Sequence, residues 1–192
     1  MTFKVEVPYG EYMPLFRYIN ELVGCSCFPD LLALKIFPNA KELTESAAAY
    51  NAVRHRLKQY DLKDPTVSVV CVGDGCTPRT ASMFAFRSAW TCYSVDPNLK
   101  GGKWESAIQR LHVVKSKIEH WSGHFEKVII VAVHSHARLE DSATHVTSNG
   151  NRSFVAIPCC VKQTLWGIAP DVEYIDKGIW SPENKVKIWR NA

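Results

Sequence analysis

Residues 67–97 constrain the fold of this chain more than any other segment. Val67–Val72 form a continuous apolar run with one serine, which is typical of a strand covered on both faces of a parallel sheet. Gly73-Asp74-Gly75 follow at once, at a point where the backbone must turn sharply. Thr77 and Pro78 then favour a helix start, with the threonine as cap and the proline in the first turn. The segment predicts a strand–turn–helix unit of an α/β fold.

A second strand, residues 91–95, follows this helix and ends at Asp96. Parallel sheets bind ligands at the carboxyl ends of their strands, so we expect the glycine turn and this acid to border one pocket. In folds of this class, an acid about twenty residues beyond the turn holds a ribose hydroxyl. The candidate ligand-binding residues are therefore Gly73, Asp74, Gly75, Thr77, Asp96 and Pro97.

This unit resembles the first half of a Rossmann-like methyltransferase that depends on S-adenosylmethionine (SAM). Gly73-Asp74-Gly75 occupy the place of the family's glycine-rich first motif, and Asp96 that of the acid ending its second strand. The resemblance implies SAM as cofactor, with Gly73 and Gly75 close to its methionine moiety and Asp96 accepting hydrogen bonds from both ribose hydroxyls. Asp74 or a backbone N–H would contact its polar groups. The chain departs from the family pattern in lacking an acid within the first strand and a third glycine.

Length and composition fit one globular domain. A chain of 192 residues can bury a sizeable core but is short for two domains. No apolar run reaches the roughly 20 residues of a membrane span, so we expect no membrane partner. The seven cysteines are odd in number and scattered, which favours reduced thiols and a cytoplasmic location. The net charge of +4 is compatible with an RNA partner.

The remaining segments continue to alternate helices and strands. Residues 1–41 contain several prolines and are predicted as an irregular cap or edge segment that contacts the pocket or another protein. Apolar residues recur at helical spacing over residues 41–60, and KVIIVAV, residues 127–133, is the clearest buried strand. A short helix is expected at 104–110, strands at 111–114 and 154–157, and a helix or loop at 137–146.

The carboxyl-terminal tail changes character. Residues 171–180 and 185–189 alternate apolar and polar side chains around a Ser-Pro-Glu-Asn turn, which is a hairpin signal. We therefore expect a Rossmann-like α/β fold over residues 42–192, with a mostly parallel central sheet and a terminal antiparallel hairpin. The strands at 67–72 and 127–133 should be adjacent and interior, because continuous apolar strands need cover on both faces.

Two groups of residues beyond the glycine unit are candidates for catalysis. His134 and His136 lie just past the strand at 127–133, where an imidazole can act as a base or orient a nucleobase. Cys159 follows the strand at 154–157 and resembles the thiol nucleophile of RNA cytosine-5 methyltransferases, a role that requires an accessible thiolate. Lys162 lies close enough in sequence to favour the thiolate. For each group, a purely structural role is the alternative.

Zinc-type ligands are present, but their spacing does not predict a metal site. Cys25, Cys27, His120, His124 and the His134/His136 pair form no paired Cys-x-x-Cys arrangement. We therefore predict no metal and expect these thiols to pack as small apolar groups.

The sequence leaves three functions open. The first is a SAM-binding methyltransferase that acts on RNA, and the second is an inactive methyltransferase-like fold that serves as a binding or assembly module. The Thr77-Pro78-Arg79 loop and the missing strand acid favour the second. The third is a site for another nucleotide or phosphorylated ligand, although the chain lacks the Gly-Lys-Ser/Thr end of a phosphate loop.

Overall fold

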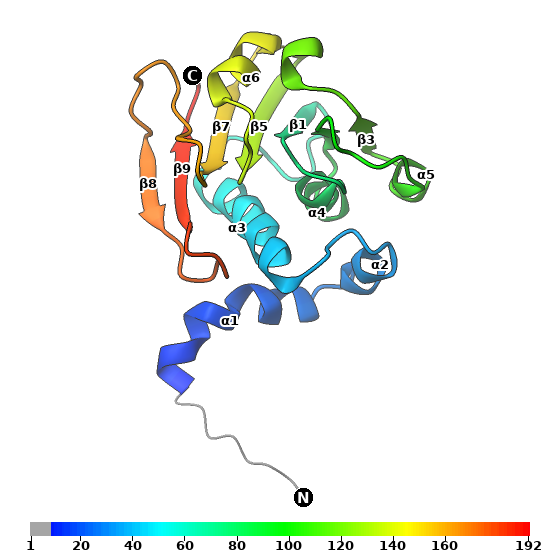
Figure 1. Cartoon of the computed structure of the whole chain (residues 1–192), viewed down its shortest axis with the longest axis vertical. Coiled ribbons are helices and arrows are strands. Elements are labelled where there is room, and N and C mark those ends of the chain that lie inside the picture. Colours follow the sequence, from blue (N-terminus) through cyan, green and yellow to red (C-terminus); the bar gives the residue numbers. More distant parts are fainter. Residues whose placement is uncertain (1–8) are drawn as a thin grey trace, which may run out of the picture.

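The computed structural model describes residues 9–192 and contains a seven-stranded sheet with helices on both faces (Figure 1). The strand order is β3-β2-β1-β5-β7-β9-β8. Strands from β3 to β7 in this order pair in parallel, whereas β9 is antiparallel to β7 and β8. The strands are β1 Val67–Val72, β2 Thr91–Val95, β3 Leu111–Val114, β5 Lys127–Val133, β7 Arg152–Ile157, β8 Val172–Ile175 and β9 Lys185–Trp189. The predicted fold class is confirmed.

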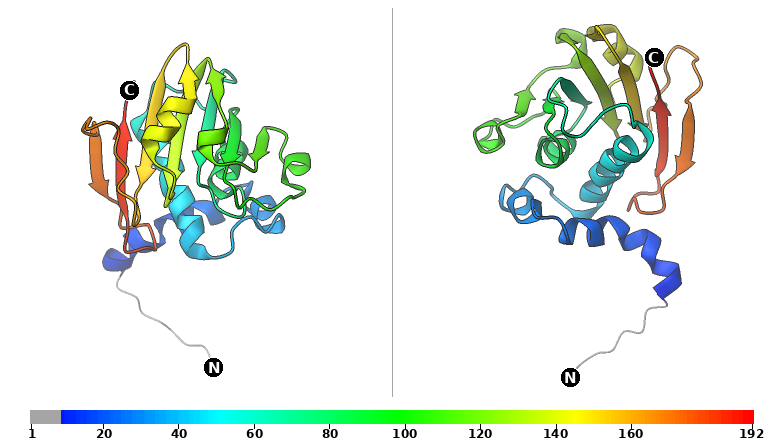
Figure 2. Two further views of the ribbon diagram at one scale, coloured as in Figure 1. Left: turned by 45° about the horizontal axis from the view of Figure 1, so that its top comes forward. Right: turned by 180° about the vertical axis from the view of Figure 1, so that it is seen from behind.

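The sheet separates the core into two apolar clusters, and helices lie on both of its sides (Figure 2). Helices α3 and α4 pack against one face of the sheet, while α6 and the 3-10 turn η1 cover the other. The helices are α1 Tyr9–Val23, α2 Phe28–Ala33, α3 Ala40–Arg56, α4 Arg79–Arg87, α5 Trp104–Ala107 and α6 Leu139–His145, with η1 at Ile118–His120. Within residues 9–192, no helix is both long and apolar enough to span a membrane.

Strands β1 and β5 form the centre of the sheet. They pair in parallel with Val70 opposite Ile130, and each has a further strand on its other side. All of β1 and all of β5 except Lys127 are buried. The two strands have the predicted bounds and are adjacent and interior, because cover on both faces removes their apolar side chains from water.

The amino-terminal segment differs from the sequence prediction. Residues 1–8 lie outside the described part, but most of the remaining segment predicted as irregular is helical, in α1, α2 and the start of α3. Helix α1 continues through Pro14, and its Tyr18 and Leu22 are buried in the core. The Tyr18 hydroxyl donates to the Asp176 carboxylate at 2.5 Å. Tyr18 and Leu22 are four residues apart and lie on one face of α1. Their packing outweighs the tendency of Pro14 to break a helix. The division of the chain at residue 41 stays a prediction.

The expected carboxyl-terminal hairpin is present, as β8 and β9. The strand predicted at 111–114 is β3, and the one at 154–157 begins two residues earlier as β7. The region predicted as helix or loop at 137–146 contains α6 and the start of β6, Val146–Ser148. Strand β6 pairs in parallel with β4, Gly123–Phe125, in a small second sheet that the sequence pattern did not predict.

Candidate functional site

A cavity of about 420 Å³ opens at the carboxyl ends of β1, β2, β3 and β5. This size is within the range of small-molecule sites. Its walls come from the turn after β1, the start of α4 and the segments that follow β2, β3 and β5. The lining residues are Val72, Gly73, Gly75, Arg79, Val95, Asp96, Pro97, Asn98, Ser116, Lys117, Ile118, Glu119, His134, His136 and Ala137.

The glycine turn forms one wall of the cavity. Gly73 and Gly75 have φ angles of 68° and 87°, in the left-handed region that glycine enters without strain. The Gly73 N–H donates to the Val95 carbonyl at 2.8 Å, which ties the turn to β2. A Cβ on Gly73 would lie 2.1 Å from the Ser135 Oγ. The close packing of this turn against the loop after β5 therefore requires glycine at position 73.

Asp96 lies in the cavity wall directly after β2 and is 7% exposed. Its Oδ2 accepts from the Gly75 N–H at 2.9 Å, and its Oδ1 accepts from the Asn98 N–H at 2.7 Å. Each carboxylate oxygen keeps acceptor capacity for a ligand after these bonds. Pro97 continues the same wall. The geometry is compatible both with a ligand-binding role for Asp96 and with stabilisation of the turn at Pro97.

Asp74 faces the protein interior instead of the cavity. Its carboxylate accepts from the N–H groups of Thr80 and Ala81 and from the Ser94 hydroxyl, at 2.9 to 3.2 Å. It thus caps α4, whose first N–H groups have no partner within the helix. Burial raises the pKa of Asp74, although nearby Arg79 and these hydrogen bonds oppose the shift. These contacts do not favour a ligand contact by the side chain, and the prediction that Asp74 or a backbone N–H of this turn contacts a ligand stays a prediction.

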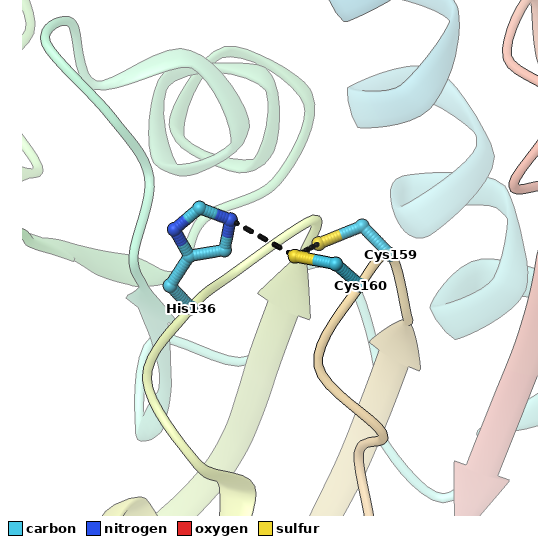
Figure 3. A group of neighbouring side chains, drawn as sticks. All are labelled: His136, Cys159 and Cys160. Atoms are coloured by element: carbon cyan, nitrogen blue, oxygen red, sulfur yellow. Dashed lines mark hydrogen bonds between the residues drawn. The ribbon is translucent and has the colours of Figure 1, made fainter.

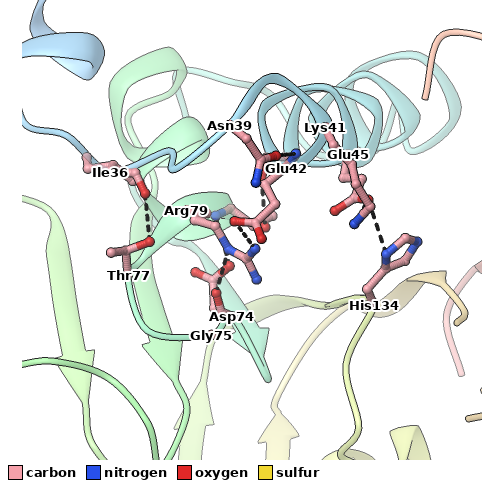
Figure 4. Close-up of polar contacts among 12 residues, drawn as sticks. Ile36, Asn39, Lys41, Glu42, Glu45, Asp74, Gly75, Thr77, Arg79 and His134 are labelled. Atoms are coloured by element: carbon pink, nitrogen blue, oxygen red, sulfur yellow. Dashed lines mark hydrogen bonds and ion pairs between the residues drawn. The ribbon is translucent and has the colours of Figure 1, made fainter. Parts of the chain in front are cut away.

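Thr77 does not cap α4 and is not among the cavity-lining residues. Its hydroxyl donates to the Ile36 carbonyl at 2.6 Å (Figure 4). That bond ties the glycine loop to the segment between α2 and α3. The predicted capping role belongs instead to Asp74, which accepts from the Thr80 and Ala81 N–H groups, while the Thr77 hydroxyl bonds a carbonyl outside the helix.

Arg79 links the glycine loop to helix α3 at the edge of the cavity (Figure 4). Its Nε donates to the Asp74 carbonyl at 2.9 Å, and its guanidinium pairs with Glu42 in the first turn of α3. Burial opposes the charge, but the carboxylates of Asp74 and Glu42 raise the pKa of Arg79. A cation is therefore fixed beside the cavity.

His134 is held by contacts at both ring nitrogens. Its Nε2 lies 2.9 Å from the Glu183 carbonyl, and its Nδ1 lies 3.2 Å from the carboxylate of the buried Glu45. The same carboxylate pairs with Lys41 at 2.8 Å. The backbone of His134 has a φ of 48°, which turns the chain sharply out of β5. His134 lines the cavity, but action as a base would require it to break one of these contacts.

His136 lies close to two cysteines (Figure 3). Its Nε2 is 3.4 Å from the Cys160 Sγ, which is 3.7 Å from the Cys159 Sγ. His136 also lines the cavity, whereas Cys159 does not. The hydrogen bond with Cys159 raises the pKa of the Cys160 thiol, which does not favour a thiolate. The catalytic roles of His134, His136 and Cys159 stay predictions.

The wall formed after β3 was not predicted from the sequence. Residues 116–119 line the cavity with one buried apolar side chain, Ile118, and two charged ones, Lys117 and Glu119. Their position in the sequence could have predicted this role, because they follow a strand at the edge of the sheet where ligands bind. The Glu42 and Glu45 contacts were also missed, since no local pattern connects helix α3 to the loops after β1 and β5.

Comparison with solved structures identifies the fold. A mutant of MtNAS in complex with SAM has a TM-score of 0.52 and 9% identity, over 93% of this chain and 72% of that one. Magnesium protoporphyrin IX methyltransferase (ChlM) from Synechocystis PCC 6803, with bound SAH, has a TM-score of 0.51 and 11% identity, over 94% of this chain and 95% of that one. The sequence matches no protein-family model and no curated protein.

The chain therefore has the Rossmann-like fold of SAM-dependent methyltransferases. The resemblance to SAM-dependent methyltransferases, predicted from the glycine turn and the acid after β2, is confirmed at the level of the fold. Because the identities are low, this likeness does not by itself assign an activity.

Proposed function

We propose that this protein binds SAM in the cavity beside Gly73 and Asp96 and transfers its methyl group to an acceptor. One observation supports this most strongly: a cavity of about 420 Å³ lies at the carboxyl ends of the strands of a methyltransferase fold, between a glycine turn and an acid. The two solved structures described above were crystallised with SAM and SAH.

The residues present fit the chemical groups of SAM. The Asp96 carboxylate has acceptor capacity left for ribose hydroxyls. Arg79 supplies a fixed cation for a carboxylate, and Pro97 and Ile118 supply apolar surface for a planar base. When bound, SAM supplies a methyl group on a sulfonium centre. Methyl transfer depends mainly on alignment, so rigid walls such as the Gly73 turn can act by positioning.

RNA is the acceptor class that we propose. Lys117 lines the cavity, Lys115 next to this wall is exposed, and the chain carries a net charge of +4. These basic side chains beside the wall after β3 and the net charge of the whole chain favour a polyanionic acceptor such as RNA, although Glu119 places an acid in the same wall.

Calorimetric titration with SAM and SAH tests the cofactor site. We expect binding by the unmodified chain, and an affinity that is tenfold to a hundredfold weaker in Asp96→Asn, because a charge-assisted acceptor contributes roughly 1.5–3 kcal/mol. Asp61→Asn is the matched control, since Asp61 makes the same type of local turn, to the Lys63 N–H at 2.9 Å, and is not among the cavity-lining residues. Lost stability with unchanged affinity in Asp96→Asn would refute the ribose assignment.

A second experiment tests transfer and the acceptor. The protein is incubated with methyl-labelled SAM and total RNA, with ribonuclease-treated RNA as control. We expect label in the RNA fraction and none after ribonuclease treatment. SAM binding without label in any RNA fraction would contradict the RNA proposal, and label in a protein or DNA fraction would redirect the acceptor class. Binding with no transfer to any acceptor would favour the alternative of an inactive binding module.

A further inference from the structure

The fold brings two sulfur ligand atoms and one imidazole nitrogen together at one edge of the sheet. His136 lies in the loop after β5, and Cys159 and Cys160 lie in the loop after β7 (Figure 3). Strands β5 and β7 are parallel neighbours whose last residues, Val133 and Ile157, are paired. The two loops therefore leave the sheet side by side. One ligand atom from each of the three side chains lies within 4.8 Å of the other two.

The separations resemble those around a tetrahedral zinc ion. With Zn–S bonds of about 2.3 Å and Zn–N bonds of about 2.0–2.1 Å, tetrahedral angles place two sulfurs about 3.8 Å apart and a sulfur and a nitrogen about 3.6 Å apart. The observed Sγ–Sγ distance is 3.7 Å, and Cys160 Sγ to His136 Nε2 is 3.4 Å. The ligand atoms of the third pair, Cys159 and His136, also lie within 4.8 Å of each other.

The environment of these cysteines differs from that of a structural thiol. Cys71 and Cys92 are fully covered and pack in the core, whereas Cys160 is exposed and Cys159 is half-buried. A thiol that packs as a small apolar group is expected in the core, and not at a polar surface beside an imidazole. Among residues 14–192, whose side chains the structure describes, this is the one cluster of three or more histidine, cysteine or acidic ligand atoms with metal-binding separations.

We propose that His136, Cys159 and Cys160 bind a thiophilic divalent cation, with Zn²⁺ as the preferred ion, and leave its fourth position open. Two thiolates and an imidazole are the ligand type that selects zinc over oxygen-preferring cations. Three protein ligands with an open position are typical of zinc sites that bind an exogenous ligand. Since His136 also lines the cavity, the ion adjoins it. His136 and Cys159 then act as ligands, in place of the predicted base and nucleophile.

Metal titration of the reduced full-length chain tests the site. After removal of metal with a chelator, Zn²⁺ is titrated in competition with a chromophoric chelator, and Co²⁺ is added to a parallel sample. We expect one equivalent of each ion, with thiolate-to-cobalt charge-transfer absorption in the near-ultraviolet. A monothiol added to the Co²⁺ form should increase this absorption if the fourth position is open. No change would contradict the open position.

Single variants identify the ligands. Cys159→Ser, Cys160→Ser and His136→Gln should each weaken Zn²⁺ binding by about a hundredfold or more, and each serine variant should lose about half of the charge-transfer intensity. Cys76→Ser is the control, because Cys76 is also an exposed thiol but lies outside the cluster. All three ligand positions lie on surface loops, and a thermal melt of each variant without metal confirms that it is folded.

Three results would overturn the proposal: no binding by the reduced protein, binding that Cys160→Ser leaves unchanged, or a Cys159–Cys160 disulfide that re-forms in the presence of Zn²⁺. These titrations contain no SAM. Their outcome is therefore independent of the cofactor titration, and each proposal can fail without the other.

Discussion

Substitution of Gly73 by alanine is expected to destabilise the protein through two separable effects. The first is backbone strain at a φ of 68°, which costs a residue with a Cβ roughly 1–2 kcal/mol. The second is overlap, because the new Cβ would lie 2.1 Å from Ser135 Oγ and 2.8 Å from Ser135 Cβ. Forced displacement in a packed region costs about 1–3 kcal/mol. Alanine also reduces the conformational entropy of the unfolded chain, which offsets part of these two costs. The expected net loss in the free energy of unfolding is about 2–4 kcal/mol.

Two other glycines isolate these effects. Gly167 has a φ of 77°, and no atom lies within 4 Å of the position that an alanine methyl group would occupy. Gly167→Ala therefore carries the strain alone and should cost about 1 kcal/mol. Gly101 has open space and no positive φ, so Gly101→Ala should be neutral or stabilise by about 0.5 kcal/mol. The expected order of stability is therefore Gly101→Ala, then Gly167→Ala, then Gly73→Ala.

Urea denaturation at equilibrium measures all three variants on one scale. A double variant with Ser135→Gly removes the two nearest atoms and should recover at least about 1 kcal/mol of the Gly73→Ala cost, measured as a coupling energy. If Gly73→Ala costs no more than Gly167→Ala, or if Ser135→Gly recovers nothing, the packing of the glycine turn against the loop after β5 is not as described.

Three further predictions concern the core, the helix cap and pH. Ile130→Asp should unfold the domain because it buries an unpaired charge, whereas Ile175→Asp at an exposed position of β8 should not, as circular dichroism will show. Asp74→Ala should lower the free energy of unfolding in urea by about 2–4 kcal/mol, since it leaves two N–H groups and a hydroxyl unpaired. The hydrogen bond from Lys127 holds the pKa of Asp64 at about 2. As the pH falls from about 4 toward about 2, the unfolded chain takes up the proton first. The stability advantage over Asp64→Asn, measured by urea midpoints, should therefore be full near neutral pH and disappear over that range.

The parts of the fold that the sequence predicted are those with a strong local cause. Strands β1 and β5 were predicted with their observed bounds, because burial of both faces requires an unbroken apolar run. Helix α1 was missed, because Pro14 is a local signal while the packing of Tyr18 and Leu22 is a tertiary one. Strands β4 and β6 are three residues long, too short to show a period.

In the candidate site, too, some features could be predicted from the sequence and others could not. Position along the chain was enough to place Gly73, Gly75 and Asp96 at the cavity, since each follows directly from the end of a strand. It was not enough to pair Arg79 with Glu42, which the packing of α4 against α3 brings together, or His136 with Cys160, which the pairing of β5 and β7 brings together. The metal alternative was weighed on Cys25 and Cys27 and did not include Cys159 and Cys160, because the proximity of these two thiols to His136 depends on the β5–β7 pairing.

The direction in which Asp74 points is explained by a buried serine in the neighbouring strand. Strand β2 is TCYSV, and its Ser94 is completely buried. A buried hydroxyl needs a hydrogen-bond partner, and the parallel pairing of Ser94 with Cys71 places it beside the end of β1, where Asp74 is the nearest acid along the chain. Asp74 therefore turns inward to Ser94 and the start of α4, whereas Asp96, which has no such partner inside, stays in the cavity wall. A serine inside a strand of this kind can thus distinguish a structural acid from one available to a ligand.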